Sequence, residues 1–342
     1  MVCEVNLLIF DCLGFYELLN FSEAFYSMWL VRGIEETDER FGKRPEERTI
    51  EDLIENSLII VDKHEGPTSH QISLWVKEIF NAKKVGHIGT LDPKVTGVLP
   101  VLLNDAVKAA PLFQRLEKEY VGIMHLHKDF DVEKLKEIIA KKFIGRIIQI
   151  PPKKAAVARR PREREVKTFD ILEVDGRDIL FQTKVEAGTY IRKLVWDIGV
   201  EAGVGAHMAE LRRIRAGNFT EEQAHSLVEV RDAFEFWKEG EEKYLRKILI
   251  PVEFAIDHVK KVFVKDTAIE AICNGAPLYP IGIVRIQEGI VEGELVAIMS
   301  LKNELVAIGI AKMNSQKMYE AKKGIAVRID RVIMKKGTYK MS

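Results

Sequence analysis

Residues 86–97 place the strongest constraint on the fold, because they pack three glycines, one proline and one carboxylate into twelve positions. Glycine allows backbone angles that are closed to other residues, and Pro93 fixes φ directly after Asp92. An apolar pattern with helical spacing precedes the stretch at 72–80, and a buried apolar run follows it at 98–103. The sequence predicts a rigid loop between buried elements, which presents Asp92. Taken alone, such a loop is more often a simple turn than an active site.

The composition is that of an ordinary globular chain with unevenly placed charge. Its 342 residues suffice for two domains, and 47% of them are apolar and 30% charged. Residues 1–57 carry thirteen acidic and five basic side chains, a net charge of −8, so the rest of the chain has a net charge of +8. The body is therefore basic and the N-terminal part acidic.

The sequence disfavours the membrane and secreted classes. No stretch approaches the roughly eighteen uninterrupted apolar residues of a membrane span, and the apolar N-terminus carries acidic side chains in place of a basic leader segment. The three cysteines, Cys3, Cys12 and Cys273, form neither an even framework nor a CxxC pair, which argues against disulfides and a cysteine zinc site. We expect a cytoplasmic protein.

Short apolar runs and turn residues predict the elements of the body. Strands are expected at 58–61, 120–127, 166–174 and 178–185, the last two joined as a hairpin at Asp175-Gly176. Helices are expected at 72–80, 105–117, 131–143 and 221–248, and from an N-cap at Thr189 to about Gly203. Phe234, Phe236 and Trp237 are the buried candidates of the late helical region. After about residue 258, short strands and one helix near 267–273 predict a small β-barrel or sandwich.

Two regions leave alternatives open. Residues 1–30 are apolar and aromatic, which fits amphipathic helices packed on the body or a natural start near Met28. Residues 153–167 carry seven basic and two acidic side chains, a net charge of +5, which fits a solvated surface or a surface that contacts phosphates. Its basic members are Lys153, Lys154, Arg159, Arg160, Arg162, Arg164 and Lys167.

Five motifs in one order resemble the TruB/dyskerin family of pseudouridine synthases, over about residues 33–336. They are Asp62-Lys63 with Gly66-Pro67-Thr68-Ser69, the stretch from Gly86 to Pro100, Lys118-Glu119-Tyr120, Gly188-Thr189-Tyr190-Ile191-Arg192, and Gly205-Ala206-His207. Thr90, residues 124–127 and residues 208–213 are similar to the archaeal and eukaryotic dyskerin branch, and the lack of the Lys-rich tails of eukaryotic dyskerins makes the archaeal type the expected one. One position departs from the pattern, because His64 stands where family members usually have proline.

The resemblance implies roles for single residues. Asp92 acts on the uridine as nucleophile or base, Arg192 keeps it charged, and Tyr120 stacks on the extruded base. The implied substrate contacts are Tyr190 in the pocket floor, Leu194 beside it, His87 against the RNA, and Lys63, which alternatively orders the Asp92 loop. The implied RNA-binding residues are Lys153, Lys154, Arg159, Arg160, Arg162 and Arg164. The alternatives are an ordinary salt bridge for Asp92 and Arg192, and core packing for the tyrosines and Leu194.

The resemblance also implies the architecture. We expect an α+β chain in three parts: an N-terminal extension at 1–56, a catalytic domain at 57–257 and a PUA RNA-binding domain at 258–336. The catalytic domain is expected to contain a mixed, mainly antiparallel sheet, and the PUA domain a small β-barrel. Residues 33–56 are expected to pack on the PUA side.

The implied function is the isomerisation of uridine to pseudouridine by the catalytic subunit of an H/ACA ribonucleoprotein. A guide RNA pairs there with ribosomal RNA, and the implied protein partners are a zinc-ribbon protein, a β-barrel protein and a kink-turn RNA-binding protein. The reaction involves neither redox change nor phosphate transfer, so no cofactor and no metal is expected. Two alternatives are a stand-alone enzyme for the TΨC loop of transfer RNA and a non-catalytic RNA-binding scaffold.

Overall fold

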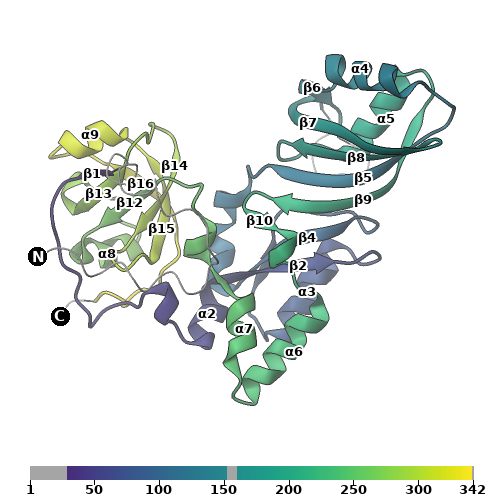
Figure 1. Ribbon diagram of the computed structural model, residues 1–342. Coiled ribbons are helices and arrows are strands. Elements are labelled where there is room, and N and C mark those ends of the chain that lie inside the picture. Colours follow the sequence, from purple (N-terminus) through teal and green to yellow (C-terminus); the bar gives the residue numbers. More distant parts are fainter. Residues whose placement is uncertain (1–28, 152–159, 341–342) are drawn as a thin grey trace, which may run out of the picture.

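The computed structural model describes residues 29–151 and 160–340. Two lobes are apparent in Figure 1, a larger one that contains the extended sheet and a smaller one built from the C-terminal strands. The expectations for residues 1–28 and for Lys153, Lys154 and Arg159 concern positions outside the described residues.

The larger sheet has ten strands among the described residues, in the order β11-β2-β4-β9-β5-β8-β7-β6, with β3 added to β4 and β10 to β9. The strands are β2 (Ser57–Lys63), β3 (Val85–His87), β4 (Thr96–Leu103), β5 (Lys118–Leu126), β6 (Gly145–Gln149), β7 (Arg162–Asp175), β8 (Asp178–Val185), β9 (Ala206–Ala216), β10 (Phe219–Thr220) and β11 (Ile250–Pro251). Strands β4 and β9 run parallel, whereas the neighbours on either side of them pair antiparallel. The expected mixed, mainly antiparallel sheet is confirmed.

Helices cover this sheet and fill the lower end of the larger lobe. They are α2 (Ile50–Asn56), α3 (Ser69–Ile79), α4 (Val132–Lys142), α5 (Ile191–Glu201), α6 (Leu227–Lys238) and α7 (Glu242–Ile248). Figure 1 shows α4 and α5 together over the end of the sheet formed by β5 to β8. Thr68 caps α3 in a reciprocal pair with Gln71.

The structure corrects four details of the helix prediction. Residues 105–117 do not form an α-helix, because the chain adopts the 3₁₀ helix η2 (Asn104–Phe113), which contains Pro111. The region 221–248 is divided into a 3₁₀ turn, α6 and α7, and Gly240 separates the two helices with a φ of +101°. Tyr190, and not Thr189, is the N-cap of α5, since the Thr189 hydroxyl donates to the Glu186 carbonyl. Phe236 is 45% exposed, although Phe234 is buried.

The smaller sheet has six strands in the described part of the chain, ordered β1-β13-β12-β14-β15-β16. Its elements are β1 (Trp29–Val31), β12 (Lys261–Val264), β13 (Ile283–Gln287), β14 (Leu295–Met299), β15 (Leu305–Ala311) and β16 (Val327–Val332), with α8 (Asp266–Cys273) and α9 (Ser315–Glu320). Strand β1 was not expected, because three residues carry no period-2 signal. It pairs antiparallel with β13, more than 250 positions later in the sequence.

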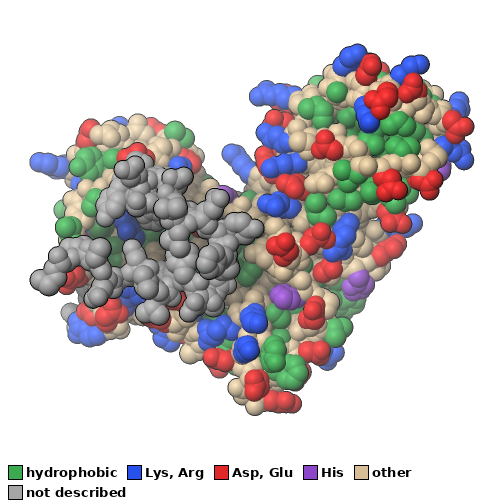
Figure 2. Space-filling model, in the orientation of Figure 1, with side chains coloured by type: hydrophobic (Ala, Val, Ile, Leu, Met, Phe, Trp, Pro, Cys, Tyr) green, Lys and Arg blue, Asp and Glu red, His purple; other side chains and the backbone are tan. Residues whose placement is uncertain are grey.

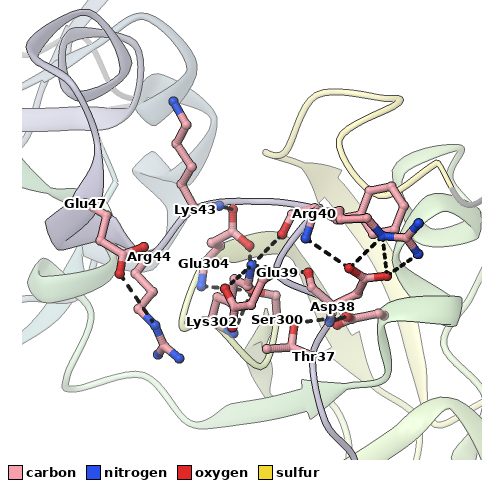
Figure 3. A network of polar contacts seen from close by, with 12 residues as sticks. Thr37, Asp38, Glu39, Arg40, Lys43, Arg44, Glu47, Ser300, Lys302 and Glu304 are labelled. Atoms are coloured by element: carbon pink, nitrogen blue, oxygen red, sulfur yellow. Dashed lines mark hydrogen bonds and ion pairs between the residues drawn. The ribbon is translucent and has the colours of Figure 1, made fainter.

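Polar contacts attach the segment after β1 to the smaller lobe (Figure 3). The Asp266 carboxylate accepts from the hydroxyl of Thr37 and the backbone amide of Asp38, both at 2.9 Å. The Lys302 ammonium donates to the carbonyls of Asp38 and Phe41. Asp266 of α8 and Lys302 of the turn between β14 and β15 thus supply fixed partners to residues 37–41 of this strap, residues 33–44.

The two lobes share one apolar core. Leu58 of β2 and Phe113 of η2 belong to the same buried cluster as Phe263, Met299 and Ile308 of the smaller sheet. Close to this cluster, the guanidinium of Arg48 donates to both carboxylate oxygens of Glu253, and both side chains are buried. The domain boundaries at 57 and 258 remain predictions, since packing is continuous across them.

Candidate active site

The loop that presents Asp92 joins β3 to β4, and glycine is required on both of its sides. Gly89 has a φ of +71° and Gly97 a φ of +100°, a region that favours glycine. A Cβ added to Gly97 would lie 2.2 Å from the backbone oxygen of Arg213, because β4 and β9 approach closely there. The glycine pattern of the sequence therefore has a direct structural cause.

Two buried side chains hold this loop in place. The Ser69 hydroxyl donates to the Leu91 carbonyl and accepts from the Leu91 amide, at 3.0 and 2.8 Å. The Lys63 ammonium, which has no exposed surface, donates to the carbonyls of His64, Pro93 and Val95 at 2.8–3.0 Å. Burial lowers the pKa of Lys63. Of the two roles expected for Lys63, these contacts support ordering of the loop.

Asp92 and Arg192 meet at the surface. The Arg192 guanidinium donates to the Asp92 carboxylate, and the two side chains are 57% and 54% exposed. Arg192 lies in the first turn of α5, whose N-terminal end carries a partial positive charge. An accessible carboxylate faced by a guanidinium and a helix N-terminus can act on a polar substrate that enters from solvent.

Tyr120 lies on the face of the larger sheet that supports this loop. It stands directly opposite Arg213 in the register of β5 and β9, and it is 8% exposed. Arg213 in turn lies under the loop, since a Cβ added to Gly89 would be 3.0 Å from its Nη1 atom. Asp92, Arg192 and Tyr120 are thus carried by elements that meet at one place.

The other expected substrate contacts differ in their surroundings. Tyr190 is half-buried, and its backbone exchanges two hydrogen bonds with the amide of buried Gln149. His87 is held at both ring nitrogens by the hydroxyls of Ser73 and Thr90, and burial is the main cause that lowers its pKa. Leu194 has no exposed surface and packs in the main core. This burial fits the core-packing alternative for Leu194, and its expected place beside Tyr190 stays a prediction.

The described part of the basic segment lies at the start of β7. Arg160 is exposed, and Arg162 and Arg164 are half-buried beside β6. A Cβ added to Gly188 would lie 3.1 Å from the Arg164 guanidinium, so Arg164 packs against the turn that leads to Tyr190. Figure 2 shows Lys and Arg side chains along the edge of the larger lobe that faces the smaller lobe.

The sequence did not predict the burial or the ion pairs of three cations near the Asp92 loop. Lys118 and Arg213 are 6% and 1% exposed, and neither was expected to be buried. Arg212, on the opposite face of β9, donates to both carboxylate oxygens of Asp62 and to Glu221. The signal was present in the alternation of side chains along a strand, which places Lys118 on the same face as Tyr120.

In the ranges 29–151 and 160–340, no group of three or more His, Cys, Asp or Glu side chains could hold a metal ion. None of the helices described is both long and apolar enough to cross a membrane.

Comparisons with known proteins agree with this arrangement. The chain matches the TruB family pseudouridylate synthase N-terminal domain at 77–191, the tRNA pseudouridylate synthase B C-terminal domain at 192–257 and the PUA domain at 260–333. The DKCLD (NUC011) domain matches residues 21–73. This match begins before residue 33, where the resemblance was expected to start.

Relatives and solved structures cover most of the chain. A probable tRNA pseudouridine synthase B of Methanopyrus kandleri is 53% identical over 305 residues, which are 89% of this chain and 90% of the relative. A crystal structure of a Cbf5-Nop10-Gar1 complex contains a chain that is 47% identical, with a TM-score of 0.86 and coverage of 92% of this chain and 96% of that one. A structure of an H/ACA RNP bound to a substrate RNA containing 2′-deoxyuridine gives 46% identity, a TM-score of 0.84 and coverage of 91% and 96%.

The order of domains, the fold and the extent of these similarities agree with one another. The N-terminal DKCLD match and the C-terminal PUA match add the features of the dyskerin type to the synthase domain. The reaction class is therefore the isomerisation of uridine to pseudouridine in RNA, and the non-catalytic alternative is set aside. The chain belongs to the TruB family of pseudouridine synthases, in its dyskerin-type form.

Proposed function

We propose that this chain is the catalytic subunit of a guide-RNA-directed H/ACA particle that isomerises uridines in ribosomal RNA. The observation that carries this proposal is similarity over more than 90% of the chain to subunits of complexes described as an archaeal box H/ACA sRNP and an H/ACA RNP. Nop10 and Gar1 are components of one of the similar complexes, and a substrate RNA is bound in another. The sequence resemblance implies three small protein subunits: a zinc-ribbon protein, a β-barrel protein and a kink-turn RNA-binding protein.

In this proposal Asp92 acts at the ribose of the target uridine. The N1–C1′ bond breaks, the uracil turns, and a C5–C1′ bond forms, with loss of the C5 proton and gain of a proton at N1. Asp92 either bonds to C1′ or removes the C2′ proton, and both routes require an accessible carboxylate. Arg192 places positive charge against it, and Tyr120 and Tyr190 line the pocket of the extruded base.

Transfer RNA is the second candidate substrate. Relatives that are 47–53% identical are named probable tRNA pseudouridine synthase B. An enzyme that acts on the TΨC loop would use the same loop, carboxylate and arginine. The two candidates therefore differ in how the RNA is selected and not in the chemistry.

We also propose that the enzyme works in the cytoplasm, in line with its cysteine pattern and its archaeal relatives.

Guide dependence distinguishes the two substrates. The full chain is combined with the small subunits and a guide RNA, and pseudouridine is measured in a matching ribosomal RNA fragment and in transfer RNA. We expect modification of the fragment only when the matching guide is present. Equal modification of the fragment without any guide would overturn the guide-directed proposal. The Asp92→Asn variant, assembled in the same way, serves as the control that assigns the activity to this carboxylate.

A further inference from the structure

Lys118 and Arg213 form a pair of buried cations beneath the Asp92 loop, and we call this pair the cationic floor. The Lys118 ammonium donates to the Leu116 carbonyl at 2.5 Å, and Arg213 Nε donates to the Val98 carbonyl at 2.7 Å. Among the residues that the structure describes, neither cation has a carboxylate oxygen within 4.0 Å. Arg213 Nη2 is buried without a hydrogen-bond partner.

This arrangement is unfavourable in the free protein. Burial of a charge without a counter-ion costs free energy, and two like charges side by side add to that cost. Burial and the charge of Arg213 together lower the pKa of Lys118 to about 8. Ordinary folding offers no reason to keep such a pair, since apolar residues of similar volume would pack without this penalty.

The cationic floor lies beneath the loop that carries Asp92 and beside Tyr120. A Cβ added to Gly89, three residues before Asp92, would be 3.0 Å from Arg213 Nη1 and 3.3 Å from Lys118 Cε. Lys118 and Tyr120 share one face of β5, and Arg213 is opposite Tyr120 on β9. The charge of Arg213 also contributes to the lowered pKa of His87, so its field reaches the start of the loop.

Asp92 does not account for the floor, because it already has Arg192 as its partner. A second negative charge arises during the reaction itself. When the N1–C1′ bond breaks, its electron pair stays with the base, and the uracil becomes an anion delocalised over N1, O2 and O4. This holds whether Asp92 bonds to C1′ or removes the C2′ proton. The anion persists until C5 bonds to C1′, a step in which Asp92 leaves C1′ or returns the C2′ proton and the base becomes neutral. Loss of the C5 proton and gain of a proton at N1 then complete the product without a change of charge.

We propose that the cationic floor stabilises the detached uracil anion through its electrostatic field, and that Lys118 and Arg213 are positioning residues for bond cleavage. They act through the low-dielectric space beside Tyr120, where fixed charges have a larger effect than in water. The inference rests on the isomerase activity and is independent of how the RNA is selected.

The acidity of the base provides the test. Fluorine at C5 makes the pyrimidine more acidic, so its anion needs less stabilisation by the protein. Single-turnover conversion of uridine and 5-fluorouridine at the same target position is measured with the wild-type particle and with Lys118→Met and Arg213→Gln, as loss of the N1-linked nucleoside. We expect each variant to lose about 10²-fold with uridine and markedly less with 5-fluorouridine, whereas Lys118→Arg and Arg213→Lys restore most of the rate.

Controls separate this effect from loss of structure. Lys302→Met removes another buried, carbonyl-bound lysine, in the smaller lobe, and should leave the ratio of the two rates unchanged. Equal losses on both substrates in the floor variants would overturn the proposal, because a purely structural defect affects both alike. Asp92→Asn abolishes conversion of both substrates, so failure of the floor hypothesis is distinguishable from failure of the enzymatic function.

A pH profile provides a second test, which needs only the wild-type particle and the charge-conserving Lys118→Arg variant. Lys118 loses its proton above its pKa of about 8, whereas Arg213 stays protonated and His87, with its lowered pKa, is already neutral. Tyr120, two residues along the same face of β5, and Arg213 on β9 are the titratable groups that share this face with Lys118. We expect the single-turnover rate with uridine to fall between about pH 7 and 9, and Lys118→Arg to remove this fall. An identical profile in Lys118→Arg would contradict the proposal.

Discussion

Asp92 and Arg192 form an ion pair across one hundred positions of sequence, and each side chain remains more than half exposed. The pair joins the loop after β3 to the first turn of α5. It leaves the carboxylate open to solvent on one side and in contact with a guanidinium on the other. Contributions of this pair to folding are small, since solvent screens exposed charges. Its importance lies in the reaction.

Replacing Arg192 should therefore separate activity from stability. We expect Arg192→Gln to lower the single-turnover rate by about 10²-fold and to change the free energy of unfolding by no more than about 0.5 kcal/mol. The rate is measured in the assembled particle and the stability by denaturant unfolding of the chain. A large loss of stability with an unchanged rate would indicate an ordinary structural salt bridge.

Ser69 should matter through the position of the Asp92 loop. Its buried hydroxyl makes both polar contacts with Leu91, so Ser69→Ala leaves two backbone groups without partners. We expect a loss of about 1–3 kcal/mol in the free energy of unfolding, together with a slower reaction. Ser57→Ala is the matched control, because Ser57 is equally buried but its hydroxyl has no hydrogen-bond partner. Similar losses in both variants would contradict the anchoring role.

Gly97→Ala tests the close approach of β4 and β9. The added Cβ would meet the backbone oxygen of Arg213 at 2.2 Å, and backbone atoms cannot rotate away as a side chain does. We expect destabilisation beyond about 3 kcal/mol, measured by chemical denaturation. Gly176→Ala separates the contribution of backbone strain, since Gly176 also has a positive φ but no atom within 4 Å of the added Cβ. It should cost about 1 kcal/mol.

Arg48 and Glu253 test the connection between the lobes. The pair is buried, and Glu253 also accepts from the backbone amide of Leu305 in β15. Arg48→Met leaves this carboxylate buried without its cation, and we expect a loss of about 3–5 kcal/mol in thermal or chemical unfolding. Arg44→Met removes an exposed cation 3.9 Å from Glu47 and should change stability little. Equal losses of stability in the two variants would show that the buried pair contributes no more to stability than the exposed pair.

Arg160 provides a test of the expected RNA surface. It is exposed at the start of β7, so Arg160→Gln should weaken RNA binding without affecting folding. We expect the slope of log K against log salt to decrease by about 0.7–0.9, measured by binding titrations at several salt concentrations. An unchanged slope would place this side chain outside the phosphate contacts and favour a merely solvated basic segment.

Local patterns in the sequence predicted much of the fold. The alternation before and after Asp175-Gly176 anticipated the hairpin of β7 and β8, and the apolar spacing after Thr68 anticipated α3. Contacts between distant segments were not accessible in this way. Strand β1 exists through its pairing with β13, and η2 forms where Pro111 and packing compete with helix propensity.

In the candidate site, too, local motifs predicted some features, and contacts between distant segments decided the others. The motifs indicated Asp92, Arg192 and Tyr120, and the structure brings their elements together. The alternation along β5 places Lys118 on the face of Tyr120, but it does not establish the burial of Lys118 or Arg213, because charged side chains are rarely buried. The two roles of Leu194 stayed open for a related reason, since helical spacing does not tell which apolar residue borders a pocket and which lies in the core.

The pairing of β1 with β13 also has a consequence for the order in which the protein matures. Strand β1 leaves the ribosome long before residues 283–287 have been synthesised, so its hydrogen-bonding edge has no native partner for most of translation. The smaller lobe can be completed only after nearly the whole polypeptide has emerged. Folding of this lobe is therefore a late event, and until then the larger sheet is the part of the growing chain that can form its native structure.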